Sequence, residues 1–269
     1  MTRPSVVITK PSTPQRSPLR SLSASQDPLV RLVCLPWSGG SASGYWSLAK
    51  NLPEWMSVLA VQLPGREDRI GEQPWRRMEQ IVEQVADALV PMLDRPLFVF
   101  GHSLGALVAH EVAQALRRKT GREPDGLIIS GHAAPHRRRL SENPLHFASD
   151  DDLASYVRTL GGTPEMILAD PHMRRAVLLV LRADFEVLET YVHHQANPLA
   201  CPMLCSAGTE DLLVSDETLA AWRAYTTSAC QMKWFVGDHF YLQSQSAAFA
   251  QVLQKWVLGQ VNGLREHRN

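Results

Sequence analysis

The sequence has no excess of charge of either sign, since 27 Lys and Arg residues balance 27 Asp and Glu residues among 269. Such a chain has no strong overall field, so we expect neither nucleic acid nor an anionic membrane as a partner. No apolar run approaches the roughly 18 residues that span a bilayer, and the N-terminus carries no apolar secretory segment. These absences predict a soluble protein of the cytoplasm.

Cysteine is scarce, and its spacing matches no known site. The four cysteines are Cys34, Cys201, Cys205 and Cys230. Although Cys201 and Cys205 are close in sequence, no second Cys or His pair has the matching spacing of a zinc site. We therefore expect reduced thiols, no metal and no other cofactor.

Residues 1–28 are predicted to form a flexible tail. The first 26 residues are rich in Ser, Thr and Pro, contain basic but no acidic residues, and cannot bury enough apolar surface to fold. A basic, Ser-rich leader is also typical of an organellar transit peptide, but prolines interrupt the amphipathic helix that such a peptide needs. The tail is the preferred interpretation.

Residues 29–262 are predicted to form one α/β domain, followed by a short C-terminal tail at 263–269. Hydrophobic residues make up 45% of the chain, enough for a sizeable core. Apolar runs typical of buried strands alternate with helical stretches, which predicts a mostly parallel sheet with helices on both faces. The predicted strands are Val30–Leu35, Val58–Leu63, Leu97–Phe100, Gly126–Ser130, Pro202–Ser206 and Met232–Val236, and the helices are Met78–Leu93, Leu104–Lys119, Ser215–Tyr225 and Ala247–Val257.

Residues 140–197 interrupt the alternation of strands and helices. They read as helices alone, notably Asp151–Leu160 and His172–His194. Because open α/β sheets bind ligands at the carboxyl ends of their strands, a helical insertion of this size predicts a lid over that edge.

A serine follows the third predicted strand in a characteristic motif. Phe98–Phe100 leads into Gly101-His-Ser-Leu-Gly105, and a helical segment follows at once. A G-x-S-x-G motif between strand and helix is typical of the nucleophile elbow of the α/β-hydrolase fold. Its glycines let the neighbouring backbones close around Ser103, whose hydroxyl is exposed at a helix N-terminus. Ser103 is the predicted nucleophile, and the alternative is a serine that merely caps the helix.

A serine nucleophile needs a base and an acid, which follow it in the chain order Ser, acid, His. Among ten histidines, His239 lies in the loop after the last predicted strand, whereas His102 is expected to point away from Ser103. Asp211 lies in the loop that follows the predicted strand at 202–206 and is the predicted acid that orients the base. Its rivals are Glu210, which would point elsewhere, and Asp238, which adjoins the histidine too closely to orient its ring.

Two backbone N–H groups are predicted to form the oxyanion hole. One belongs to Leu104, the residue after the nucleophile. The other is expected from Ser38, because Gly39 and Gly40 let the loop after the first predicted core strand turn sharply toward a substrate. The alternative is an ordinary glycine-rich turn.

Four segments together resemble the type II thioesterases, the free-standing α/β hydrolases that accompany polyketide synthases and non-ribosomal peptide synthetases. They are Leu35-Pro-Trp-Ser-Gly-Gly-Ser-Ala42, Gln62-Leu-Pro-Gly-Arg-Glu67, the elbow, and Gly237-Asp-His-Phe-Tyr-Leu242. Leu181-Arg-Ala-Asp184 in the predicted lid is also similar to the family pattern. The resemblance covers about residues 30–260. The mammalian medium-chain fatty-acyl thioesterase belongs to the same family.

The resemblance implies a substrate and a partner. The substrate would be an acyl or aminoacyl thioester on the phosphopantetheine arm of an acyl or peptidyl carrier protein, removed in an editing role by a monomer. Arg137, Arg138 and Arg139 could contact an acidic carrier protein, or could form a solvated basic turn. The alternatives are a medium-chain fatty-acyl-carrier thioesterase, a general serine esterase or acyltransferase, and a non-catalytic module that binds carrier protein.

Overall fold

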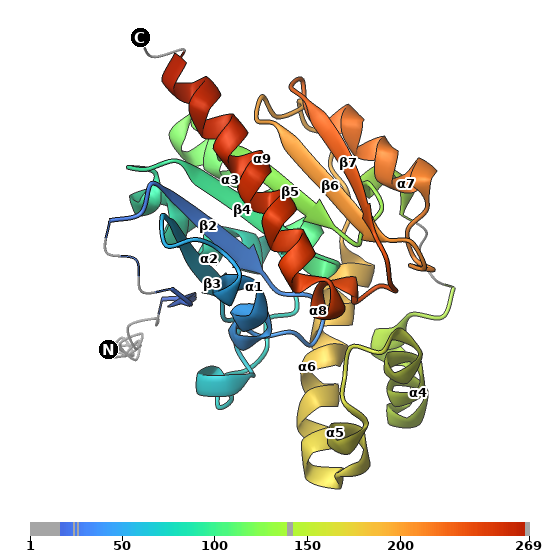
Figure 1. Cartoon of the computed structure of the whole chain (residues 1–269). Coiled ribbons are helices and arrows are strands. Elements are labelled where there is room, and N and C mark those ends of the chain that lie inside the picture. The colour runs from blue at the N-terminus through green and yellow to red at the C-terminus, as the bar shows by residue number, and fades with distance from the viewer. Residues whose placement is uncertain (1–16, 24, 26, 139–141, 267–269) are drawn as a thin grey trace, which may run out of the picture.

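A twisted, mostly parallel sheet is the centre of the protein. The structure, a computed structural model, describes residues 17–23, 25, 27–138 and 142–266 (Figure 1). Within these residues seven strands lie in the order β1-β3-β2-β4-β5-β6-β7, and β1 alone is antiparallel to its neighbour. The strands are β1 Leu19–Ser21, β2 Val30–Leu35, β3 Met56–Val61, β4 Leu97–His102, β5 Gly126–Ser130, β6 Met203–Gly208 and β7 Cys230–Phe235.

Helices cover both faces of this sheet, as the alternating pattern predicts. One face packs against α2 and α3, and the other against α1 and α9, each with its own apolar core (Figure 1). The helices are α1 Trp46–Lys50, α2 Met78–Leu89, α3 Leu104–Thr120, α4 Asp150–Leu160, α5 Glu165–Ala169, α6 Pro171–Thr190, α7 Asp216–Ala220, α8 Tyr241–Ser244 and α9 Ser246–Glu266. Among the described residues, no helix has the length and apolar character that a membrane crossing requires.

Helices α4, α5 and α6 lie between β5 and β6 in the chain and project beyond one end of the sheet (Figure 1). They share a small apolar core of their own, which includes Leu153, Leu168, Leu178 and Phe185. Helix α6 ends at Thr190, earlier than the predicted His194, because Tyr191 has extended backbone angles. The inserted segment is therefore a helical unit with its own packing.

Two predicted tails are partly wrong. Within the predicted tail at 1–28, Leu19–Ser21 pairs with β3, and Leu22 is buried. A strand of three residues is too short to leave an apolar period in the sequence, so its Ser- and Pro-rich surroundings dominated the prediction. At the other end α9 continues to Glu266, into the predicted tail at 263–269. Residues 1–16 and 267–269 lie outside the described residues.

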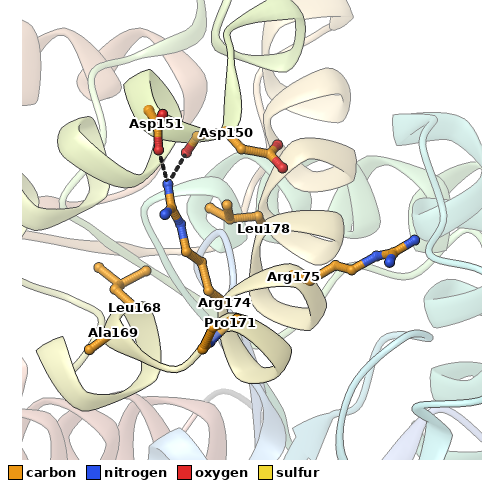
Figure 2. Close-up of a pocket in the computed structure, with 8 residues that line it drawn as sticks. All are labelled: Asp150, Asp151, Leu168, Ala169, Pro171, Arg174, Arg175 and Leu178. Carbon is orange, nitrogen blue, oxygen red and sulfur yellow. Dashed lines mark hydrogen bonds and ion pairs between the residues drawn. The ribbon is translucent and has the colours of Figure 1, made fainter.

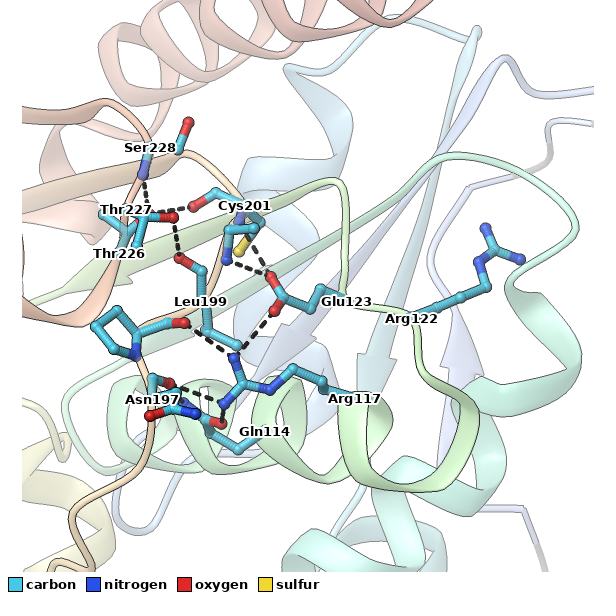
Figure 3. A network of polar contacts seen from close by, with 12 residues as sticks. Gln114, Arg117, Arg122, Glu123, Asn197, Leu199, Cys201, Thr226, Thr227 and Ser228 are labelled. Carbon is cyan, nitrogen blue, oxygen red and sulfur yellow. Dashed lines mark hydrogen bonds and ion pairs between the residues drawn. The ribbon is translucent and has the colours of Figure 1, made fainter.

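The chain returns from the helical insertion to the sheet through a network of polar contacts (Figure 3). Arg117 of α3 donates to the carbonyls of Asn197 and Pro198, at 2.8 and 2.9 Å. Glu123 accepts hydrogen bonds from the backbone N–H groups of Ala200 and Cys201, at 2.6 and 3.1 Å, and pairs with Arg117. This anchoring fixes the chain just before β6, the strand that leads to Asp211.

Replacing Glu123 tests this anchor. Glu123→Ala leaves the N–H groups of Ala200 and Cys201 without their acceptor and removes the ion pair with Arg117, so we expect the free energy of unfolding to fall by about 2 kcal/mol. Urea denaturation followed by circular dichroism measures the change. Glu83→Ala, which removes an exposed ion pair with Lys119, is the control and should cost less than about 1 kcal/mol. An equal loss in the two variants would contradict the anchor.

Candidate active site

Ser103 sits at a strained turn between β4 and α3. Its φ of 56° and ψ of −120° lie in a region that non-glycine residues rarely adopt. The turn closes because Gly101 and Gly105 have no side chain. A Cβ on Gly101 would lie 1.9 Å from the carbonyl oxygen of Gly105, and one on Gly105 would lie 2.2 Å from that of Leu35. The local sequence therefore dictates the elbow geometry predicted for Ser103.

His239 and Asp211 form a buried pair at the same edge of the sheet. Nδ1 of His239 lies 2.9 Å from Oδ2 of Asp211. The other carboxylate oxygen of Asp211 accepts a hydrogen bond from the backbone N–H of Leu213 at 2.9 Å. Both predicted rivals of the acid are exposed, and Asp238 accepts a hydrogen bond from the N–H of Phe240 instead. The pair has the contacts that hold an imidazole in one orientation.

The loops that carry this pair touch through a glycine. Asp211 follows β6 and His239 follows β7, and the two strands are adjacent and parallel. A Cβ on Gly208, the last residue of β6, would lie 2.2 Å from the carbonyl oxygen of Asp238. Gly208 thus lets the two loops approach closely enough for the imidazole to reach the carboxylate.

Ser103 and His239 line one cavity of about 70 Å³, together with Ser38 and Gly39 of the loop after β2. The structure therefore brings the predicted nucleophile, base and oxyanion loop to the same place. The inserted helices close the cavity with apolar side chains from α4 and α6, namely Tyr156, Val157, Leu160, Leu181, Phe185 and Leu188.

A buried ion pair supports the loop that carries Ser38. Both guanidinium N–H groups of Arg66 bind the carboxylate of Asp184 in α6, at 2.8 and 2.9 Å. Asp184 also accepts the N–H of Gly39 at 2.7 Å, and Arg66 donates to the carbonyl of Gly40 at 2.7 Å. The N–H of Gly39 is thus already engaged inside the protein. Leu104 is the first residue of α3, so its N–H has no acceptor within the helix.

The other members of the segment 62–67 brace the same loop. Oε1 of Gln62 accepts the N–H of Ala42 at 2.8 Å, and Glu67 accepts the hydroxyl of Ser41 at 2.7 Å. Glu67 has a positive φ of 48°, which directs it back toward the loop. The segment that carries the family resemblance therefore acts here as a structural brace.

Sequence reasoning missed the partner of Arg66. Glu67 and Asp68 are the acids beside Arg66 in the sequence, but its partner Asp184 is 118 residues away in the chain. The only available signal was that both residues stand in segments with family resemblance. The predicted basic turn is also used differently, since Arg138 donates to backbone carbonyls of Leu188 and Tyr191. Arg139 lies outside the described residues.

A second, larger depression of about 540 Å³ lies on the inserted helices, away from Ser103 (Figure 2). Arg174 reaches across it to Asp151 and to the backbone of Asp150. Leu178 lines this depression and not the cavity of Ser103, and Met166 is largely exposed.

The fold and this arrangement define an α/β hydrolase with its polar residues at the carboxyl edge of the parallel strands. A family model described as "Thioesterase domain" matches residues 30–257. The chain is 37% identical to gramicidin S biosynthesis protein GrsT of Aneurinibacillus migulanus, over 79% of this chain and 83% of the relative. It is also 37% identical to thioesterase PikA5 of Streptomyces venezuelae, over 84% of this chain and 80% of the relative.

A solved structure agrees with these sequence relatives. The type II thioesterase BorB from the borrelidin biosynthetic cluster has a TM-score of 0.82 and 31% identity, covering 93% of this chain and all of that one. The protein belongs to the thioesterase family, and its predicted resemblance to type II thioesterases and its predicted fold class are confirmed.

The Arg66–Asp184 pair leads to a stability prediction. Asp184→Asn keeps the shape of the side chain but leaves a buried guanidinium without a counter-charge, so we expect a loss of about 3 kcal/mol in the free energy of unfolding. Guanidinium chloride titration measures this loss. Glu186→Gln in the same helix removes the half-exposed pair with Arg76 and should cost less than about 1 kcal/mol. A similar cost in both variants would contradict the role of the pair.

Proposed function

We propose that the protein is a serine thioesterase that hydrolyses acyl and aminoacyl thioesters held on the phosphopantetheine arm of carrier proteins. Its role would be to edit polyketide or non-ribosomal peptide assembly by removing stalled or incorrect groups. The observation that carries the proposal is the strained Ser103 in one cavity with the buried His239–Asp211 pair. Membership of the thioesterase family supports the reaction class.

In the first half of the reaction Ser103 is the nucleophile. His239 takes the proton of the hydroxyl as the oxygen attacks the thioester carbonyl carbon. The intermediate collapses to an acyl-enzyme ester as the carbon–sulfur bond breaks, and the proton on His239 passes to the leaving thiolate. Asp211 holds the ring of His239 and stabilises its protonated form.

In the second half water replaces the thiol. His239 removes a proton from the water as its oxygen attacks the acyl-enzyme carbonyl, and returns that proton to Ser103 as the ester bond breaks. The free acid and the original enzyme result. In each half of the reaction His239 thus acts first as a base and then as an acid.

The backbone N–H groups of Ser38 and Leu104 are the proposed oxyanion hole. Both belong to segments at the cavity. The N–H of Gly39, next to Ser38, donates to Asp184 and is therefore not available to bind an oxyanion. A donor of this kind contributes about 3–4 kcal/mol to the transition state. The brace from Arg66 and Asp184 would hold Ser38 in place without touching the substrate.

The carrier-bound substrate is proposed from the relatives. Two of them, GrsT and PikA5, carry names from peptide biosynthesis and thioester chemistry, and both align with most of this chain. The segment at 140–197 would act as the lid that shapes the acyl site, since α4 and α6 line the cavity. The proposal includes a monomer in the cytoplasm, which agrees with four cysteines that are free.

A first experiment tests the substrate and the nucleophile together. We expect faster release of an acyl group from a phosphopantetheinylated carrier protein than from a small thiol or an alcohol ester. Ser103→Ala should lower this release at least about 10³-fold, because the acyl-enzyme cannot form. Mass spectrometry of the carrier protein follows the loss of the acyl group. Ester hydrolysis without any advantage for the carrier would favour a general esterase.

A second experiment tests the acid. Asp211→Asn should lower kcat by about 10⁴-fold while the fold stays intact, because the amide no longer holds the productive tautomer of His239. Glu210→Gln, one residue away and exposed, is the matched control and should change kcat by less than about threefold. Steady-state release of an acyl group from a small thiol measures both. Comparable losses would assign the acid elsewhere.

A further inference from the structure

Another cavity, distinct from the depression in Figure 2, shares a wall with the cavity of Ser103. It has a volume of about 150 Å³, twice that of the cavity that contains Ser103. Both cavities are lined by Trp37 and Phe240, so these two rings form the partition between them. The inner wall consists of buried side chains that include Tyr45, His102 and Phe249. The exposed residues Gly44, Ser47 and Gln243 also belong to its lining, so this pocket reaches the protein surface as well.

The partition is built from aromatic rings in edge contact. The Trp37 ring lies edge-on to Phe240, with centroids 5.9 Å apart, and to His102 at 6.0 Å. A Cβ on Gly44 would lie 2.6 Å from the Trp37 ring, and one on Gly162 would lie 2.2 Å from the Phe240 ring. Trp37 is thus held by the core, whereas Phe240 packs against the segment after α4.

A chain of hydroxyl groups fixes the protonation pattern of His102. Ser206 donates to the carbonyl of Ile129 at 3.4 Å and accepts from the hydroxyl of Tyr241 at 2.8 Å. Tyr241 therefore accepts from Ser130 at 2.8 Å, and Ser130 in turn accepts from Nδ1–H of His102 at 2.9 Å. In a neutral ring this leaves Nε2 of His102 as a hydrogen-bond acceptor.

Two buried polar atoms on the wall of the pocket have no hydrogen-bond partner among the described residues. They are Nε2 of His102 and Oγ of Ser246, and both side chains are more than nine-tenths buried. Burial lowers the pKa of His102 well below its usual value, with His239 and His132 adding to the effect, so the ring is neutral at pH 7. An apolar pocket with a few convergent polar groups is the usual form of a small-molecule site.

We propose that this pocket is a subsite for the acyl group and selects acyl units that carry a hydrogen-bond donor, such as a hydroxyl or amino group. The inference rests on the proposed thioesterase function. Displacement of Phe240 admits the acyl chain, and its donor binds Nε2 of His102. Because the reacting carbonyl stays at Ser103 and the pantetheine arm leaves toward the carrier protein, the acyl end is the part of the substrate that would reach this pocket. An unsubstituted chain leaves both polar atoms unpaired, which costs binding energy.

The test compares matched thioesters of a small thiol, butyryl and 3-hydroxybutyryl. We expect wild-type protein to show a kcat/KM about tenfold higher for the hydroxyacyl group, the value of one buried hydrogen bond. Ser246→Leu, which fills the pocket, should remove this preference. If that variant does not fold, Leu242→Phe fills the pocket from another wall and should have the same effect. Ser246→Ala is the matched control that leaves the volume open and should keep most of the preference.

Removing the Phe240 ring opens the partition between the two cavities, whereas the variants above fill the pocket. Phe240→Ala should raise kcat/KM for 3-hydroxyhexanoyl relative to 3-hydroxybutyryl by about tenfold, and adding Ser246→Leu should cancel the gain. Phe240→Leu keeps most of the partition, so its ratio of kcat/KM values should lie between those of wild-type protein and Phe240→Ala. A gain that persists in the double variant would overturn the inference, because the chain would then not enter the pocket.

Binding to Ser103→Ala, followed by NMR, separates the two proposals. If wild-type protein hydrolyses both thioesters equally and the filling variants change nothing, the pocket holds only water and the subsite is wrong, while the function stands. If no thioester is hydrolysed but the Ser103→Ala protein binds the hydroxyacyl thioester about tenfold more tightly, the function is wrong and the subsite is supported.

Discussion

Asp184 carries a carboxylate into the interior at the point where three distant segments meet. Through it helix α6 is joined to Arg66 after β3 and to the N–H of Gly39 after β2. A buried carboxylate is stable only when its oxygens are bonded and its charge is paired, and this one has both. The position of the helix above the cavity and the course of the loop around Ser38 therefore depend on one ion pair.

The edge of the sheet imposes the second constraint. The nucleophile, acid and base follow β4, β6 and β7, whose carboxyl ends meet because the strands are parallel. Each needs a backbone approach that only glycine allows, at Gly101 and Gly105 for the elbow and at Gly208 for the acid and base. The strain at Ser103, of the order of 1–3 kcal/mol, is offset by the packing of the strands on either side.

Sequence reasoning succeeded where the determinants are local or follow chain order. The elbow is a contiguous motif between strand and helix, and Asp211 and His239 could be chosen by their places after late strands. It failed where a contact joins distant segments, as between Arg66 and Asp184, or where an element is too short to show a period, as in β1. Two predicted strands, Val30–Leu35 and Gly126–Ser130, have the bounds of the structure, and the ends of the other four differ from it by at most two residues.

The alternation of side chains along β4 links the two cavities. Val99 packs in the core on the α2 and α3 side, whereas Phe98 and Phe100 pack on the α1 and α9 side. His102 continues the second series, so it points away from Ser103 toward the pocket beside Phe249. One strand end thus presents a nucleophile to one cavity and a hydrogen-bond acceptor to the next. A substrate that reached both would be held on either side of its reacting carbonyl, and the ring of Phe240 would decide which acyl chains could do so.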